Sequence, residues 1–305
     1  MTKLVIRKIS WEFDASVPFM WQPANPDFGL FCNAFTFIAV PFERYIVGAI
    51  RMAADRFAAD PAIAAEADAF LKQEAQHAAA HRKHMLALIE RYPDLEQCYA
   101  DACAAYDALL DQEPAEFHLA YIANLEATFT PLFKVLLDNR DALFGGGDPQ
   151  VAALMLWHFV EEIEHRSSGL MLSRYLSPSP WYRIRHVRRT FAHVAGVADE
   201  IAQGFDRIVP FAERGASTRE LLSGAFLTGE LRQRLGLRRN GSAAPTIFGP
   251  VPTRELLAML WRLALSQTPY HDPADQPLPA WADTWMRAYE NGVDMRTFVA
   301  GQPER

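Results

Sequence analysis

The feature that most constrains this chain is a set of glutamates and histidines that recurs at helical spacing through its first 175 residues. The set consists of a lone glutamate, a Glu-x-x-His, a second lone glutamate and a second Glu-x-x-His: Glu43, Glu74 with His77, Glu126, and Glu162 with His165. Residues three apart on an α-helix lie on one face, so a Glu and a His at this spacing can reach the same ion. The pattern therefore predicts four helices that meet around two metal ions.

Four long helices are predicted in this part of the chain from apolar periodicity and from its interruptions. Asp-Pro pairs at 60–61 and 148–149 each place an N-cap before a proline at the first helical position. Pro41 and Pro131 should delay or kink the helices that contain them. The helices are expected at 32–58, 61–91, 115–139 and 149–175, with a lesser helical stretch at 94–110 linking the second and third.

The chain is expected to have three parts. Residues 1–30 combine a short alternating stretch with a turn-rich segment of three prolines, which favours an arm laid over the body. Residues 31–176 form the helical, metal-binding part. Residues 177–305 are expected to form a helical cap, with helices at 181–208, 218–237, 253–265 and 281–300.

The charged residues of the pattern lie in otherwise apolar stripes, which predicts that they point into the core. In the last of the four helices the stripe reads Val151, Met155, His158, Glu162, His165, Gly169 and Leu172. Burying several carboxylates together without compensation costs many kcal/mol, and a multivalent cation is the simplest remedy. The stripes therefore strengthen the prediction of a metal site.

Two more histidines extend the pattern. His158, four residues before Glu162, completes an H-x-x-x-E-x-x-H motif and is expected to bind metal directly. His81, four residues after His77, is either an extra ligand or a partner behind the ligands. The expected metal ligands are thus Glu43, Glu74, His77, Glu126, His158, Glu162 and His165.

Other residues near the pattern are expected to support it. Glu161 and Glu164 face away from the stripe, so they are expected behind the ligands or at the surface, with Arg166 as an ion-pair partner. An apolar lining would exclude water from the site. Its expected members are Phe37, Phe70, Phe129, Phe133 and Trp157.

The order of ligands matches the ferritin-like carboxylate bundles that hold two iron or manganese ions. We therefore expect an all-α fold, a ferritin-like four-helix bundle with a dinuclear site and a C-terminal helical extension. PFER at 41–44, QEAQHAAAH at 73–81 and WHFVEEIEHRS at 157–167 resemble the bacterial family of predicted metal-dependent hydrolases, a member of the ferritin-like group. The resemblance covers most of the chain and includes YHDP at 270–273. The H-x-x-x-E-x-x-H motif is also similar to that of di-iron arylamine N-oxygenases of the p-aminobenzoate type.

The function expected from these ligands is oxidation of a small organic substrate by O2 at two iron ions; a mixed Mn/Fe site or other divalent metals stay open. The electron donor is undetermined. Two alternatives remain: a hydrolase that uses a metal-bound water, as the family label implies, and an iron-handling protein. No G-x-S-x-G or H-E-x-x-H motif accompanies the hydrolase label.

Composition limits the partners and the compartment. The formal charge of −7 argues against a nucleic-acid-binding surface. Three cysteines without C-x-x-C spacing predict neither a disulfide framework nor a thiolate zinc site. Without a signal-like N-terminus or a transmembrane segment, we expect a cytoplasmic protein, and a homodimer is compatible with its class. The basic run at 183–189 is assigned no role.

Overall fold

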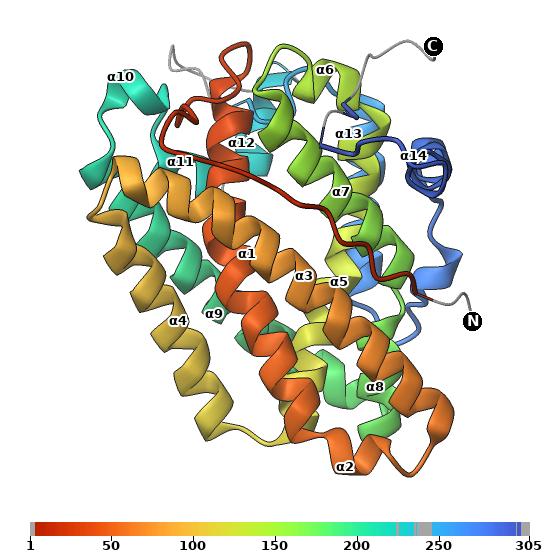
Figure 1. The fold of residues 1–305 in the computed structure, drawn as a ribbon. Coiled ribbons are helices and arrows are strands. Elements are labelled where there is room, and N and C mark those ends of the chain that lie inside the picture. Colours follow the sequence, from red (N-terminus) through yellow and green to blue (C-terminus); the bar gives the residue numbers. More distant parts are fainter. Residues whose placement is uncertain (1–3, 224–225, 235, 237–245, 297, 300–305) are drawn as a thin grey trace.

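The structure is a computed structural model that describes residues 4–223, 226–234, 236, 246–296 and 298–299. Every regular element in these ranges is helical, so the fold is all-α. Figure 1 shows the helices packed side by side around a common core. The long helices are α1 (Pro26–Met52), α3 (Pro61–Arg91), α4 (Leu95–Gln112), α5 (Ala115–Asp138), α7 (Pro149–His165), α9 (Pro180–Ile208), α13 (Thr253–Ser266) and α14 (Ala280–Glu290). The short elements are α2 (Ala54–Phe57), α6 (Arg140–Phe144), α8 (Ser168–Leu176), α10 (Phe211–Arg214), α11 (Thr218–Leu222), α12 (Phe226–Arg234) and the 3-10 turn η1 (Pro273–Asp275).

Helices α1, α3, α5 and α7 carry the predicted ligands and contact one another in a ring. Helix α1 packs against α3 and α5, and α7 packs against the same two helices. The Asp-Pro starts of α3 and α7 form as expected: the carboxylate of Asp60 accepts hydrogen bonds from the amides of Ala62 and Ile63, and Asp148 caps α7 in the same way. This arrangement fits the expected ferritin-like bundle, which stays a prediction.

Several expected boundaries were wrong. Helix α1 starts at Pro26 instead of residue 32, because Asn25 caps it and the proline occupies the first turn, where no amide donor is needed. It then continues through Pro41 and ends at Met52. The helix expected at 149–175 is two helices, α7 and α8, separated at Arg166 and Ser167.

Other differences concern the supporting helices. The lesser stretch expected at 94–110 is a full helix, α4, which packs on α1 and α9. The helix expected at 218–237 is divided into α11 and α12; residues 224–225, 235 and 237 lie outside the described residues. Helix α14 ends at Glu290, ten residues before the expected end at 300. Helices α9 and α13 both pack on α5, and the division into three parts stays a prediction.

The N-terminal segment crosses α3 and α7 as an extended strap (Figure 1). Its carbonyl groups are held from α3, since the Gln73 amide donates to the Val5 carbonyl and the Lys83 ammonium donates to the Trp11 carbonyl. The strap covers the side of α3 and α7 behind the predicted metal ligands.

One helix of the described chain, α1, is long and apolar enough to cross a membrane. In its most apolar window, 72% of the residues are buried inside the protein. Burial of this kind is typical of the core helix of a soluble protein.

Candidate metal centre

The structure brings the predicted residues of α1, α3 and α7 together as two adjacent triads. In each triad, three side chains offer donor atoms that lie within 4.8 Å of one another, and all six residues are buried. We call them triad A and triad B. Triad A consists of Glu43, His77 and His158, and triad B consists of Glu74, Glu162 and His165.

Glu162 lies where the triads meet. Its Oε1 is 3.0 Å from His158 Nε2 and 3.5 Å from His77 Nδ1, both of triad A. Its Oε2 is 3.0 Å from His165 Nε2, within its own triad. A carboxylate with one oxygen toward each group can bridge two ions.

The donor atoms satisfy the main requirement of a metal site, because several of them are buried and lack a hydrogen-bond partner. A buried polar atom without a partner costs free energy, which a bound cation recovers. The unpartnered atoms are Glu43 Oε2, Glu74 Oε1, His77 Nδ1, both carboxylate oxygens of Glu126, Glu162 Oε2, and both ring nitrogens of His165.

The protonation behaviour of these carboxyl groups follows from burial and from their neighbours. Burial raises the pKa of Glu43, Glu74 and Glu126 above its ordinary value. Burial acts in the same direction on Glu162, but the surrounding histidines outweigh it and hold the pKa of Glu162 well below its usual range. Glu162 is therefore the carboxylate that stays ionised most readily.

Glu126 belongs to neither triad and lies at the edge of triad B, with Oε2 3.9 Å from His165 Nε2. Its position depends on Gly169 of α8. A Cβ atom at residue 169 would lie 3.0 Å from Glu126 Cγ and 3.3 Å from Ile122 Cγ2. The glycine thus leaves room for the Glu126 side chain.

Replacing Gly169 with alanine is expected to lower metal affinity about tenfold, since the new methyl group displaces the Glu126 carboxylate. The change should not weaken the helix, because alanine has the higher helix propensity. Titration of the metal-free protein with Zn²⁺ measures the effect. Gly196→Ala on α9 is the matched control, because no atom lies within 4 Å of its added Cβ. Equal affinities of the two variants would contradict this role for Gly169.

Behind triad A, a chain of charged groups fixes the orientation of His77. His77 Nε2 donates a hydrogen bond to Glu161 Oε2 at 2.9 Å, which leaves Nδ1 directed at Glu74 and Glu162. Glu161 is in turn paired with Arg7 of the strap at 3.1 Å, and the second guanidinium nitrogen of Arg7 donates to Glu164 at 3.0 Å. A carboxylate behind a ligating histidine sets its tautomer and makes it a stronger ligand.

The contacts among His77, Glu161, Arg7 and Glu164 correct one expectation and refine another. Arg166 does not pair with Glu161 or Glu164; its guanidinium donates to the Ile163 carbonyl, and the charge partner is Arg7 instead. Glu161 lies behind the ligands, which was one of the two placements expected for it. The sequence did not single out Arg7, because Lys8 follows it directly in the alternating stretch at the N-terminus.

A second set of hydrogen bonds lies behind His158 and holds its ring. Its Nδ1 lies 2.9 Å from His81 Nε2, and His81 Nδ1 lies 3.0 Å from the hydroxyl of Thr36. Both ring nitrogens of His81 are therefore engaged, and in this structure His81 is a hydrogen-bond partner of His158. The same hydroxyl of Thr36 lies 3.3 Å from Nδ1 of the buried His84.

The family of predicted metal-dependent hydrolases matches residues 5–210 of the chain. The chain belongs to this family. No curated protein and no solved structure matches it. The match with the family includes every predicted ligand together with Arg7 and Glu161, and residues 270–273 lie outside the matched range. The two triads are the groups of residues in this structure that could hold the metal implied by the family's description.

Aromatic residues pack against the histidines of the site, and two of them are among the expected lining residues. Phe70 packs edge-on against His165 and Trp157 packs against His77, with ring centroids 4.9 and 5.0 Å apart. One expected lining residue faces elsewhere, since Phe37 packs on Phe205. Phe133 stacks on Phe159, and its ring centroid also lies 6.2 Å from that of His158.

A cavity of about 90 Å³ opens beside the triads, between α1, α4 and α5. Phe129 lines it as the sequence predicted, whereas Phe35, Phe42 and Tyr106 were missed. Only their positions in the fold identify these three, because α1 is apolar on nearly every face and its periodicity does not single out the cavity wall.

Acidification is expected to destabilise the metal-free protein through His84. Burial lowers the pKa of His84 from 6.5 to about 3, so only the unfolded chain takes up this proton as the pH falls below 6.5. The contribution of His84 to the free energy of unfolding is fully present above pH 6.5, and it declines as the pH falls from 6.5 toward 3. Its loss amounts to about 2 kcal/mol at pH 5.

Urea unfolding at pH 7 and pH 5 tests this expectation. His84→Asn retains a side chain that hydrogen-bonds to Thr36 but does not titrate in this range, so its stability should change less between the two pH values than that of the unaltered protein. An equal change in the free energy of unfolding between pH 7 and pH 5 in both proteins would show that protonation of His84 does not cause the loss of stability.

Proposed function

We propose that this protein is a hydrolase that holds two divalent ions in triads A and B and cleaves a small-molecule substrate beside them. The observation that carries the proposal is the pair of buried triads, several of whose donor atoms lack a hydrogen-bond partner. Membership of the family of predicted metal-dependent hydrolases supports the same reaction class. Glu126 would complete the set at the edge of triad B.

A divalent ion in such a site polarises the substrate and lowers the pKa of a coordinated water toward neutrality. The residues of the chain provide the rest. Glu161 fixes the His77 ring, His81 fixes the His158 ring, and Phe70 and Trp157 keep bulk water away. Glu43 lines the cavity, so a ligand of triad A lies directly beside the space open to a substrate.

A second candidate is oxidation of an organic substrate by O2 at two iron ions. The observation in its favour is the donor set of four glutamates and three histidines on helices, which matches the carboxylate bundles that bind iron or manganese. The apolar cavity beside the ligands also suits a reaction from which water must be excluded.

One experiment separates the two candidates. Metal-free protein is loaded with Zn²⁺, Mn²⁺ or, without oxygen, Fe²⁺, and each form is assayed with a panel of neutral esters, amides and phosphate esters; O2 uptake is recorded for the iron form. Turnover with redox-inactive zinc supports the hydrolase. Rapid O2 uptake by the iron form, with no turnover by the zinc form, would replace that proposal with the oxidase or oxygenase. Protein that binds none of these metals would overturn both.

A further inference from the structure

The cavity beside the triads has walls of two kinds. One wall consists of metal-site residues, namely Glu43, Glu74, His158 and Glu162. The remainder is apolar except for a single phenol, that of Tyr106. The apolar wall consists of Phe35, Ile38, Ala39 and Phe42 from α1, and Leu125 and Phe129 from α5.

The residues that line this cavity include no lysine and no arginine. Sites for phosphate or carboxylate substrates generally supply a guanidinium or ammonium group, or a helix N-terminus, to match the negative charge. Here the fixed charges of the wall are carboxylates, which repel anions wherever a metal ion does not neutralise them. An anionic group away from the ions would lose its hydration without gaining a partner.

The size of the cavity limits what can enter. Its volume of about 90 Å³ corresponds to roughly three water molecules at ~30 Å³ each, so it accommodates a short aliphatic group and is far smaller than the usual site for a drug-sized ligand. Phe35, Ile38 and Phe129 are only partly buried, which places the outer wall toward the surface between α1 and α5. A longer substrate would extend past these three residues.

We propose that this cavity is the substrate pocket of the metal centre and that it selects a neutral substrate, whose short apolar group lies against Phe42 and Phe129 while its reacting group faces the triads. This inference rests on the proposed function for the reaction and adds the substrate class. Away from the ions the wall offers no side-chain cation to a phosphate or carboxylate group, whereas short-chain neutral esters and amides fit its apolar side.

The occupancy of the cavity can be tested with xenon, which binds dry apolar cavities. Xenon relaxation is measured by ¹²⁹Xe NMR with Mn²⁺-loaded and Zn²⁺-loaded protein. Because Mn²⁺ is paramagnetic, xenon in this cavity should relax much faster in the manganese form. Equal relaxation in the two forms would overturn the placement of the pocket.

Variants of the wall localise the effect. Ala39→Leu fills the cavity and should abolish the manganese-dependent relaxation. If this variant fails to fold, the milder Phe129→Leu is used instead. Phe129→Leu should enlarge the cavity and alter xenon binding. Trp261→Ala is the control, because Trp261 is 65% exposed on α13 and could bind xenon only at the surface. A loss of the effect in this control, or its persistence in both wall variants, would contradict the proposal.

Competition tests the substrate class. Isobutanol and isobutyl phosphate have the same apolar group and differ in charge, and we expect isobutanol to displace xenon from the zinc form at a concentration at least tenfold lower. Stronger displacement by the phosphate would overturn the preference for neutral substrates. Absence of hydrolysis in the assays above would affect the proposed reaction alone, because xenon binding does not depend on turnover.

Discussion

Glu162→Ala is expected to remove metal from both triads at once. The carboxylate contacts His77 and His158 on one side and His165 on the other, so each ion would lose a ligand. Even partners behind a ligand contribute about 10–100-fold to metal affinity, and we therefore expect a fall of more than about 100-fold here. Metal content after dialysis, measured by plasma emission spectrometry, gives the result directly.

Glu162→Gln serves as a second variant, because it preserves shape while removing the negative charge. Glu90→Ala is the matched control, since Glu90 lies on the exposed face of α3 and should leave the metal content unchanged. Folded Glu162 variants that retain two ions per chain would show that the two triads do not share this carboxylate.

Arg7→Met is expected to produce the largest loss of stability. Arg7 is 2% exposed and forms ion pairs with Glu161 and Glu164, so its removal leaves the buried carboxylate of Glu161 and the partly buried carboxylate of Glu164 without their cation. Breaking a buried pair in this way costs about 3–5 kcal/mol. Urea unfolding of the metal-free protein measures the loss.

Two comparisons identify the cause of that loss. Arg44→Met removes an exposed pair with Asp107 and should cost less than about 1 kcal/mol. In the Arg7→Met background, the further change Glu161→Gln should recover part of the lost stability, because it removes one unpaired charge. A loss of similar size in Arg44→Met, or no recovery in the double variant, would contradict the ion-pair explanation.

The sequence predicted the parts of this structure that depend on local chemistry. The starts of α3 and α7 follow from an Asp-Pro pair, in which the carboxylate caps the first turn and the proline needs no hydrogen-bond partner. The spacing of Glu74 and His77 on one helical face places both beside the same site. These signals need only a few neighbouring residues, so they could be recognised without knowledge of the fold.

The remaining features depend on contacts between distant segments. Arg7 and Glu161 are 154 residues apart in sequence, and no periodic pattern relates them. The cavity wall joins Phe42 on α1 with Tyr106 on α4, and the latter helix was expected to be only a minor link. The break between α7 and α8 was missed because the apolar stripe continues across it through Gly169 and Leu172.

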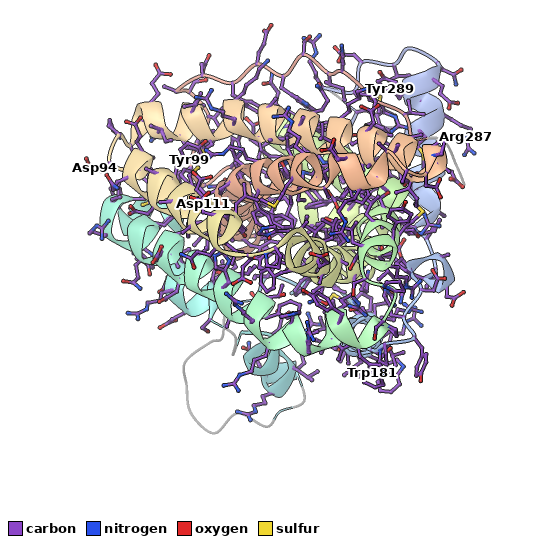
Figure 2. The ribbon with its side chains drawn as sticks, turned by 90° about the horizontal axis from the view of Figure 1, so that it is seen from below. Asp94, Tyr99, Asp111, Trp181, Arg287 and Tyr289 are labelled. Atoms are coloured by element: carbon purple, nitrogen blue, oxygen red, sulfur yellow. The ribbon has the colours of Figure 1, made fainter. Side chains whose placement is uncertain are left out.

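The guanidinium group of Arg7 has a further contact, with the C-terminal helix. It lies 5.8 Å from the ring centroid of Trp285 and 5.6 Å from that of Tyr289, which Figure 2 labels on α14. These aromatic faces attract the cation. Helix α14 therefore takes part in the support of His77, although it lies outside the stretch that matches the family.

This contact joins segments that a newly synthesised chain makes at very different times. The predicted ligands have all been made once His165 has been added, but Tyr289 follows only on the order of 10 s later at the usual rates of translation. During that interval the ligands exist without the aromatic residues that close over Arg7. The contacts of Arg7 with Trp285 and Tyr289 thus form only after α14 has been made and has docked.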